Sequence, residues 1–522
     1  MRPVDARTLE SGRVLEAGIC IVGAGAAGIT LAKALSGTGS DILLVEAGDR
    51  APDAAIQALH DVESLGYPLR PNYINRARQY GGSCNLWAGR SIRLWPEDVD
   101  GQGWPLPFAE IARRYPAAAA VLGLPEPSLL EARTWTDQLS PTEASVYAGD
   151  LVPVVSLWAA RPMRFAQVHG PVLEAAPDVR ILLHANATGL DSQDGRRVGA
   201  LRLATLDGRR LEVRAGRFVL AAGGMENARL LLLSEGLGQG REHIGHCFMD
   251  HPRTVFGKAV LSAGSRLPLM SGWPVRRGKV QLGMALSPEA QRRQGLLNHY
   301  CTFESEVSGY AAQQYQASVE VAKVLLRKGH AGSRFDLGAI GKGRIDDLIY
   351  QLSPKEIMPH WMFRLLATAK ARLRPPKGPQ RFVLVTFCEQ PPDPDSRCTL
   401  SAERDALGLP RLAVDWRIGD DVRRSVLRLH EHLGRHLEAT GLGRVEPGDP
   451  AAMRFTDASH HMGTTRMSET PATGVVDAEG RMHGVDNLWL AGSSVFPTAG
   501  HANPTLTIVA LALRLAERLR AG

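Results

Sequence analysis

The stretch from Ile19 to Gly48 constrains the fold more than any other part of the chain. A run of β-branched residues is followed by three glycines, by an apolar segment with helical periodicity, and by a second apolar run that ends on Glu46. This order is typical of a dinucleotide-binding βαβ unit, in which a pyrophosphate lies at the helix N-terminus and the acidic residue binds a ribose hydroxyl. We therefore expect a bound adenine dinucleotide, and the alternative is a glycine-rich turn that binds no ligand. The glycines are Gly23, Gly25 and Gly28, and we expect strands at 19–22 and 42–45 with a helix ending near 35.

Composition limits the size of the protein and its partners. A chain of 522 residues with 44% hydrophobic content is long enough for about two domains. Its 61 Lys and Arg against 54 Asp and Glu give a net charge of +7, which suits an anionic cofactor. This excess is smaller than the basic surface typical of nucleic-acid binding, and the sequence has no basic motif interleaved with aromatic residues. We expect no nucleic-acid partner.

The cysteines and the apolar segments indicate the compartment. The six cysteines are scattered without a CxxC pair or metal-ligand spacing, which favours free thiols in a reducing compartment and no metal site. The N-terminal residues lack an apolar leader core, and no run reaches the roughly 18 apolar residues of a membrane span. We therefore expect a soluble, cytoplasmic protein. The cysteines are Cys20, Cys84, Cys247, Cys301, Cys388 and Cys398.

Between the two ends, strand and helix signals alternate. The run 217–233 repeats the strand, glycine and helix order, so we expect Gly223 to lie against the same dinucleotide, although an ordinary connection would look similar. A second glycine-rich loop, 76–90, carries Gly82 and Trp87, which together suit close contact with a flat ligand. Further strands are expected at 179–184, 200–205, 211–213, 382–387 and 412–416, with helices at 108–122 and 420–440 and a hairpin turn at Asp207-Gly208.

The segment 321–380 concentrates the positive charge. It holds twelve Lys and Arg against four Asp and Glu, so the rest of the chain is nearly neutral. Within it, apolar residues recur at helical spacing between basic ones from 354 to 376. Such a face could contact a membrane surface, a partner protein or the domain's own core, and the pattern leaves these three interpretations open.

The C-terminal seventy residues carry the catalytic candidates. A strand is expected at 487–491, and Asn503-Pro504 is expected to open a long helix, with Asn as the cap and Pro at the first helical position. The histidines His460, His461 and His501 precede this helix start. Imidazole accepts protons near neutral pH, so one histidine could take an alcohol proton while Asn503 donates to the oxygen. The competing interpretations are structural hydrogen bonding and metal ligation, and no carboxylate at ligand spacing supports the latter.

Five segments in this order resemble the glucose-methanol-choline (GMC) oxidoreductases. They are GAGAAG with Glu46, YGGSCNLWAG, VLAAGGMENARLLL, HHMGTTRM and SSVFPTAGHANPTLTIVALAL. The resemblance is strongest to the branch with pyranose 2-oxidase and glycoside 3-oxidase. It implies an α/β fold with a Rossmann-like FAD-binding domain of the p-hydroxybenzoate hydroxylase type, and an inserted α+β substrate domain built on an antiparallel sheet.

The resemblance also implies domain boundaries and a site. The FAD-binding domain would comprise 1–130, 170–250 and 450–522, and the substrate-binding domain 131–169 and 251–449, with a basic lid or partner segment near 321–380. His460 would be the catalytic base and Asn503 its partner, with His461 and His501 as candidate substrate-side groups. Pyranose 2-oxidase has a histidine in its flavin-attaching loop just before the tryptophan, where this chain has Leu86, so we expect non-covalent FAD. The implied cofactor contacts are Gly23, Ala24, Gly25, Ala27, Gly28, Glu46, Ala47, Gly81, Gly82, Ser83, Asn85, Leu86, Trp87, Ala222, Gly223, Gly492, Ser493, Asn503, Pro504 and Thr505.

The expected function is FAD-dependent oxidation of an alcohol, most simply a secondary hydroxyl of a pyranose or glycoside. His460 would take the hydroxyl proton while a hydride passes to flavin N5, and an electron acceptor (dioxygen, a quinone or a cytochrome) would reoxidise the flavin. The alternatives are an alcohol of a secondary metabolite, a non-oxidative lyase or decarboxylase of the same fold, and a flavin-fold binding protein without turnover. The basic segment could also serve a homo-oligomer, a membrane or a protein partner.

Overall fold

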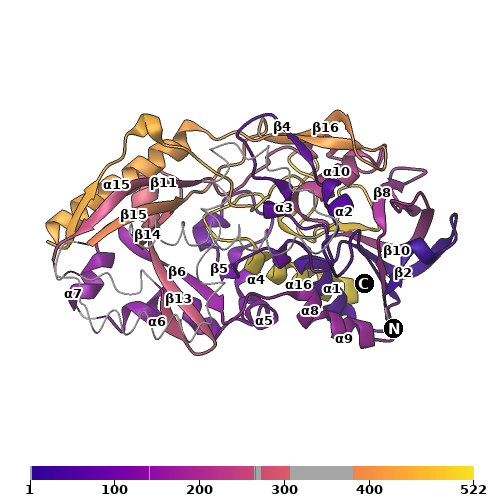
Figure 1. Ribbon diagram of the computed structural model, residues 1–522, viewed down its shortest axis with the longest axis horizontal. Helices are drawn as coiled ribbons and strands as arrows, with labels where there is room; N and C mark the ends of the chain where they lie inside the picture. Colours follow the sequence, from indigo (N-terminus) through magenta and orange to yellow (C-terminus); the bar gives the residue numbers. More distant parts are fainter. Residues whose placement is uncertain (1–2, 140, 264, 266–271, 306–379, 522) are drawn as a thin grey trace, which may run out of the picture.

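The computed structural model describes residues 3–139, 141–263, 265, 272–305 and 380–521. Two large sheets lie toward opposite ends of the molecule (Figure 1). The N- and C-terminal helices accompany the first sheet, and the long helix α15 (Asp420–Ala439) accompanies the second (Figure 1). Most of the basic segment 321–380, and with it the expected apolar helical face, lies outside the described residues. Among the helices of the described ranges, none combines the length and the apolar character that crossing a bilayer would require.

The first sheet has the order β1-β7-β3-β2-β10-β9-β8, and β19 also pairs with β10. Strands β1, β7, β3, β2, β10 and β19 are mutually parallel, whereas β9 and β8 join in antiparallel pairing. This arrangement confirms the predicted Rossmann-like domain. The strands are β1 (Val4–Asp5), β2 (Val14–Val22), β3 (Ile42–Val45), β7 (Val179–Leu183), β8 (Asn186–Asp191), β9 (Ala200–Ala204), β10 (Arg210–Leu220) and β19 (Leu488–Leu490).

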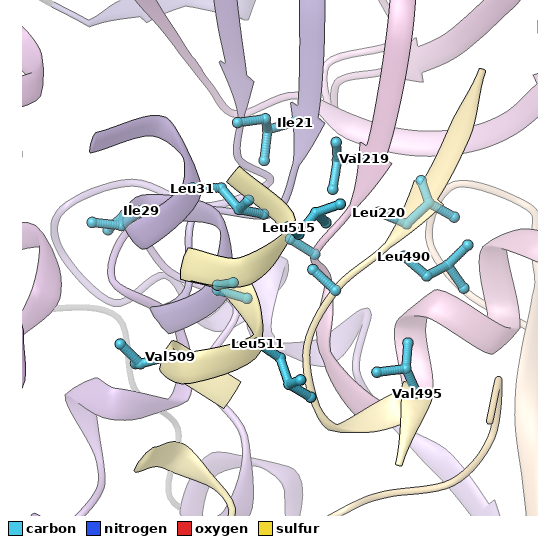
Figure 2. Close-up of a cluster of buried hydrophobic side chains, with 14 of the residues drawn as sticks. Ile21, Ile29, Leu31, Val219, Leu220, Leu490, Val495, Val509, Leu511 and Leu515 are labelled. Atoms are coloured by element: carbon cyan, nitrogen blue, oxygen red, sulfur yellow. The ribbon is translucent and has the colours of Figure 1, made fainter. Parts of the chain in front are cut away.

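A continuous apolar core explains why these strands are parallel and central. All four residues of β3 are buried, as are the last four of β2, which is the pattern of strands covered on both faces. Helices α1 (Ala26–Leu35) and α16 (Thr505–Ala521) pack against each other, and Leu31 of α1 and Leu515 of α16 lie beside Val219 of β10 (Figure 2). The last segment of the chain therefore completes the core that the first segment begins.

The second sheet is antiparallel throughout, in the order β18-β11-β15-β14-β13-β6-β5, with β12 paired to β13. It confirms the predicted antiparallel sheet, and the role of its domain in binding substrate stays a prediction. Leu429, Leu433 and Leu437 of α15 are buried against it. The strands are β5 (Arg90–Ser91), β6 (Leu151–Ala159), β11 (Arg253–Leu261), β12 (Trp273–Val275), β13 (Gly278–Leu286), β14 (Tyr300–Ser305), β15 (Gln380–Phe387) and β18 (Gly443–Glu446).

A small third sheet joins distant segments. Strand β17 (Pro410–Asp415) pairs with β16 (Arg397–Arg404) in antiparallel fashion and with β4 (Val62–Ser64) in parallel. Residues assigned in advance to different domains thus share one sheet here, and the exact domain boundaries stay a prediction. The remaining α-helices are α2 (Ala54–Ala58), α3 (Asn72–Asn75), α4 (Phe108–Ala112), α5 (Tyr115–Val121), α6 (Ala132–Thr136), α7 (Pro141–Ala144), α8 (Phe165–Val168), α9 (Gly170–Ala175), α10 (Gly223–Leu232) and α11 (Pro288–Gln294).

Three local expectations differ from the structure. The helix expected at 108–122 is two helices, because Pro116 lacks the N–H that would continue the first one. The strand expected at 211–213 and the one expected at the start of the run 217–233 are a single strand, β10, because β2 begins earlier than expected and pairs with β10 from Glu212 to Leu220. Helix α16 begins at Thr505, and the carbonyl of Pro504 accepts from the amide of Ile508 at 2.8 Å, so the helix starts slightly later than the expected Asn503 cap.

Candidate active site

The glycine-rich turn after β2 sits at the edge of the sheet where the parallel strands end. An alanine Cβ at position 28 would lie 1.9 Å from the carbonyl oxygen of Gly23, so only glycine allows α1 to start this close to the strand. A Cβ at Gly25, by contrast, would meet only the Cα of Gly82, at 3.7 Å. Gly25 therefore borders open space at the N-terminus of α1, where unpaired amides favour an anion.

Glu46 links the ends of two parallel strands. Its carboxylate is buried, with 6% of the residue exposed, and accepts hydrogen bonds from the amides of Ala24 and Gly48, each at 2.9 Å. A carboxylate oxygen can accept more than one hydrogen bond, so these contacts leave capacity for a hydroxyl group. The expected ribose contact stays a prediction.

The second glycine loop packs directly on the first. The amide of Gly81 donates to the carbonyl of Ala24 at 2.9 Å, and a Cβ on Gly82 would lie 2.7 Å from the Cα of Gly25. Trp87 is anchored by a hydrogen bond from its indole Nε1 to the carbonyl of Met163 at 2.9 Å. Of the other expected contacts in this loop, Ser83 accepts from the amide of Ala77, Asn85 donates to the carbonyl of Tyr80, and Leu86 is 43% exposed.

Two further glycines line the same edge. A Cβ on Gly223 would meet no atom within 4 Å, and a Cβ on Gly492 would meet only the Cα of Gly223, at 4.0 Å. The buried Asn227, which the sequence reasoning missed, holds these ends together, because its Oδ1 accepts from Ala222 N and its Nδ2 donates to Ser494 Oγ. Open space bordered by glycines at the carboxyl ends of parallel strands fits the phosphates and rings of a dinucleotide. The residues present therefore fit FAD.

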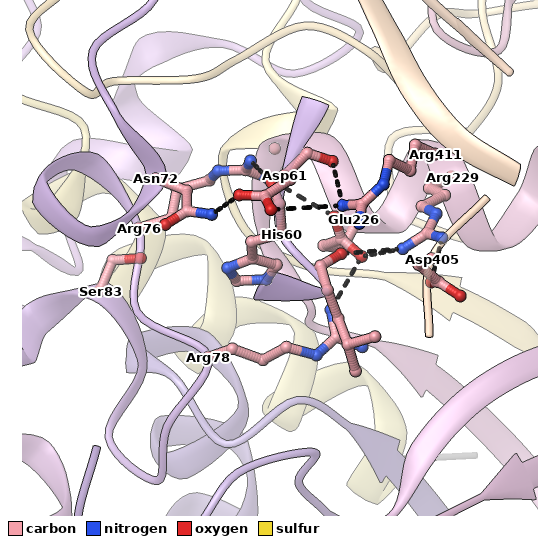
Figure 3. Close-up of polar contacts among 12 residues, drawn as sticks. His60, Asp61, Asn72, Arg76, Arg78, Ser83, Glu226, Arg229, Asp405 and Arg411 are labelled. Atoms are coloured by element: carbon pink, nitrogen blue, oxygen red, sulfur yellow. Dashed lines mark hydrogen bonds and ion pairs between the residues drawn. The ribbon is translucent and has the colours of Figure 1, made fainter. Parts of the chain in front are cut away.

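A buried polar cluster fixes the loop before Gly81, as Figure 3 shows. Arg76 and Arg78 of this loop both contact Glu226 of α10, and Arg229 of α10 binds the Asp405 carboxylate. Burial acts to raise the pKa of Glu226, but His60 and the three guanidinium groups outweigh it and hold that pKa well below its usual range. The cluster thus attaches the glycine loop to α10 through charged contacts (Figure 3). Sequence reasoning missed this cluster, because its members come from four separate segments.

His460 and Asn503 lie together, as predicted for the catalytic pair. Asn503 Nδ2 is 3.1 Å from His460 Nε2, although the two residues are far apart in sequence. The backbone amide of His460 donates to Asp250 Oδ2 at 3.1 Å, and Ser459 before it has a φ of 63°, so a tight local turn directs the ring. Both side chains are only partly buried, which leaves them accessible to a small molecule.

A second imidazole, His251, contacts the first, and the sequence reasoning missed it. Its Nδ1 lies 2.8 Å from His460 Nδ1, and its Nε2 lies 3.0 Å from the carbonyl oxygen of Gly500. Burial lowers the pKa of His251 to about 4. Desolvation, followed by His251 and the cationic Arg70, also lowers the pKa of His460 well below 6.5. Both rings are therefore neutral at neutral pH, and a neutral imidazole can accept a proton.

The two other predicted histidines lie close by in different surroundings. His461 stacks on Phe248 at 5.8 Å between ring centroids, and its Nε2 is 3.7 Å from Asp250 Oδ2. His501 is 1% exposed and packs edge-on against Trp95, at 4.7 Å between centroids. Burial lowers the pKa of each to about 3. His501 has no hydrogen-bond partner on either ring nitrogen within the described ranges, which leaves a donor available for a bound group.

Metal chemistry finds no support in the part of the chain that the structure describes. Its ranges contain no cluster of three or more His, Cys, Asp or Glu side chains suited to holding an ion. All six cysteines lie within these ranges, and they are buried and free, as expected. Burial raises the pKa of the Cys84 thiol, beside the second glycine loop, to about 12, so this thiol is not a nucleophile at neutral pH.

Comparison with known proteins agrees with this geometry. Residues 392–512 match a family model described as GMC oxidoreductase, and residues 21–80 match an NAD(P)-binding Rossmann-like domain. The chain is 24% identical over 598 aligned positions to the fructose dehydrogenase large subunit of Gluconobacter japonicus, with 98% of each covered. It is 37% identical to paromamine 6'-oxidase of Streptomyces fradiae over 136 residues, which cover 25% of this chain and 24% of that protein.

A solved structure shows the same fold. The pyridoxine 4-oxidase from Mesorbium loti superposes with a TM-score of 0.59 at 20% identity, covering 97% of this chain and 99% of that one. The parallel sheet, the paired His460 and Asn503 and the matched family model agree with the predicted family. The chain therefore carries a Rossmann-like domain and a C-terminal GMC oxidoreductase domain, and its relatives along the whole length include a sugar dehydrogenase of the CH–OH-oxidising kind.

Proposed function

We propose that this protein uses non-covalent FAD to oxidise a secondary hydroxyl of a pyranose or glycoside to a carbonyl. The contact between His460 Nε2 and Asn503 Nδ2, at 3.1 Å, is the observation that carries the proposal, because it pairs a proton acceptor with a hydrogen-bond donor. FAD, when bound, would supply the hydride acceptor. The glycines at positions 23, 25, 28, 82, 223 and 492 would hold it, with Glu46 at the ribose.

Residues of the chain itself would accept the proton of the substrate hydroxyl and stabilise the alcohol oxygen. In the free protein the Asn503 amide donates to the lone pair of His460 Nε2. A substrate hydroxyl that donates to the same lone pair takes the place of the amide, which then donates to the alcohol oxygen. As the carbinol hydride leaves, His460 takes the hydroxyl proton and Asn503 stabilises the charge on the oxygen. Base catalysis of this kind contributes about 10²- to 10⁴-fold, and a lost oxyanion donor costs about 10²- to 10³-fold.

The choice of a sugar rests on the relatives. The large subunit of a fructose dehydrogenase aligns along nearly the whole chain, and this supports a sugar substrate. The match to paromamine 6'-oxidase supports the second candidate, an alcohol on a secondary metabolite, although it covers a quarter of the chain. Both candidates need the same pair of residues and the same hydride acceptor.

An anaerobic substrate screen tests the proposal. The purified yellow protein is mixed without oxygen with pyranoses, glycosides, aminoglycosides and sterols, and loss of flavin absorbance is followed. We expect rapid bleaching by a sugar or glycoside, slowed by at least about 10²-fold in His460→Ala, with FAD still bound. Asn503→Ala should slow it by about 10²- to 10³-fold. A protein that takes up no FAD, or a His460→Ala variant that reduces at the wild-type rate, would refute the mechanism.

The identity of the electron acceptor is tested separately. Reduced protein is exposed to dioxygen, to a soluble quinone and to cytochrome c, and flavin reoxidation is timed. Turnover of an alcohol with an electron-accepting dye would distinguish an oxidoreductase from a non-oxidative lyase or decarboxylase. Bleaching by any substrate would exclude a binding protein without turnover.

A further inference from the structure

His251 and His460 make a direct contact between two imidazole nitrogens. His251 precedes β11, is 1% exposed, and faces His460 edge-on with 5.0 Å between ring centroids. The distance of 2.8 Å between the two Nδ1 atoms is that of a hydrogen bond, so one of the two nitrogens carries a proton and the other does not.

The surroundings of His251 determine which of the two Nδ1 atoms carries the proton. Its Nε2 faces the carbonyl oxygens of Gly500, at 3.0 Å, and Ala499, at 3.4 Å. A carbonyl oxygen only accepts, so Nε2 of His251 must carry a proton. In a neutral ring the other nitrogen is then unprotonated. The Nδ1 of His251 therefore accepts, and the proton in the contact belongs to Nδ1 of His460.

The consequence reaches the reactive side of His460. With its single proton on Nδ1, the neutral ring leaves Nε2 as a lone pair. An independent contact agrees, because the Asn503 Nδ2 amide group at 3.1 Å can only donate, and Nε2 must accept from it. The backbone carbonyls that face His251 and the side-chain amide of Asn503 thus specify the same tautomer of His460, with its proton on Nδ1.

A buried carboxyl group, that of Asp250, holds the backbones of the two histidines. Asp250 Oδ1 accepts from the backbone amides of His251, at 2.6 Å, and Ala458, at 2.9 Å, and Oδ2 accepts from the amide of His460, at 3.1 Å. Burial and the neighbouring Asp457 raise the pKa of Asp250 to about 8, and the amide donors act in the opposite direction. Both histidine backbones are therefore attached to one side chain that is itself fully buried.

We propose that His251 is a positioning residue that keeps the proton of His460 on Nδ1, so that Nε2 is always available as the base. The role of His460 as a base rests on the proposed function, whereas the tautomer does not. The low pKa of His251 agrees, since a neutral ring is the form that can accept at Nδ1. The other titratable or charged groups that act on His460 are His461, Arg70, Arg90 and Asp250.

The tautomer can be measured without any substrate. In FAD-loaded protein labelled with ¹⁵N-histidine, long-range ¹H–¹⁵N spectra distinguish an N–H at Nδ1 from one at Nε2, and His460→Gln assigns the signal. At pH 7 we expect the wild-type His460 ring to be protonated on Nδ1. A wild-type ring protonated on Nε2 would overturn the proposal, whether or not any alcohol is oxidised.

Two variants of His251 separate its acceptor from its bulk. In His251→Asn the side-chain oxygen lies near the former Nδ1 and can still accept, whereas His251→Phe fills the space with no acceptor. We expect His460 to stay protonated on Nδ1 in the Asn variant, and to lose that preference in the Phe variant. An unchanged tautomer in a folded Phe variant would overturn the proposal. If the Phe variant does not fold, loss of Nδ1 protonation in the Asn variant would overturn it instead.

Kinetics provide the second measurement. A wrong tautomer beside an otherwise intact base costs about 10⁴-fold in the Ser-His-Asp triad, which sets the upper end of the effect here. In His251→Phe we expect flavin reduction to slow by about 10²- to 10⁴-fold while KM changes only a few-fold, and in His251→Asn by less than about tenfold. A rise in KM with an unchanged rate would overturn the proposal. If no alcohol reduces wild-type FAD, the proposed function fails and the tautomer measurement still decides this inference.

Discussion

Replacing Gly25 by alanine should weaken FAD binding and leave the fold intact. The residue has φ −87° and ψ −162°, which is extended backbone that alanine adopts without strain. Its new Cβ would lie 3.7 Å from the Cα of Gly82, which is an ordinary van der Waals distance. The protein alone therefore has room for the methyl group, and that room is the space assigned to the cofactor phosphates.

The size of the effect follows from two terms. For the apoprotein, alanine is a poorer helix cap than glycine, which lowers the free energy of unfolding by up to about 1 kcal/mol. Alanine also makes the unfolded chain less flexible, which raises the free energy of unfolding by about 0.4–1 kcal/mol. The two terms oppose each other, so the free energy of unfolding should change by less than about 1 kcal/mol. For the complex, an extra methyl in a closely packed contact costs about 1–3 kcal/mol, which is a roughly 5- to 150-fold higher Kd.

Gly28→Ala is the matched control. Its Cβ would lie 1.9 Å from the carbonyl oxygen of Gly23, so the backbone itself must shift and the free energy of unfolding must fall. The assay titrates FAD into each apoprotein by fluorescence quenching, and urea unfolding followed by circular dichroism gives the stability. The reasoning is refuted if Gly25→Ala binds FAD with an unchanged Kd, or if it destabilises the apoprotein as much as Gly28→Ala does.

Three further predictions rest on other parts of the structure. The lowered pKa of His460 keeps the base neutral as pH falls, so the rate of flavin reduction should vary less than about twofold between pH 8 and pH 6. A histidine with an ordinary pKa near 6.5 would instead give about a fourfold fall in rate over this range. Stopped-flow measurements of flavin reduction distinguish the two outcomes. Acid precipitation should leave all flavin absorbance in the supernatant, because Leu86 cannot bond to the cofactor, and a yellow pellet would contradict this. Leu31→Ala should lower the free energy of unfolding by about 2–5 kcal/mol, since Leu31 is fully buried in the core of Figure 2, and a urea midpoint equal to that of the wild type would refute this.

Local signals were sufficient to predict the first βαβ unit. Strand β3, helix α1 and the glycines between them are specified by neighbours in sequence, and the structure has them where the pattern indicated. Strand β10 was predicted in two pieces because Ala215 and Gly216 are weak strand formers. A Cβ on Gly216 would lie 3.1 Å from the carbonyl oxygen of Gly18, so the close approach of the neighbouring strand favours glycine within β10 at this position. No single-strand pattern contains that information.

The site divides in the same way. His460 and Asn503 were predictable because each lies in a recognisable segment near the end of the chain, and the structure brings them into contact. His251 was not, because its importance depends on carbonyls some 250 positions away. Asn227 and the cluster around Glu226 likewise depend on partners supplied by other segments. These contacts form only when distant segments fold together, so the local periodicity of the sequence does not predict them.

The late position of β19 and α16 in the chain affects how the protein is made. Strand β19 is the parallel partner of the last three residues of β10, and α16 packs on α1, yet both are synthesised after some 480 other residues. During translation the edge of β10 and the apolar surface of α1 therefore stay exposed to solvent until β19 and α16 are made. Exposed strand edges and apolar patches promote aggregation. The nascent chain should depend on chaperones until β19 and α16 have emerged, and the cofactor should bind only after that point.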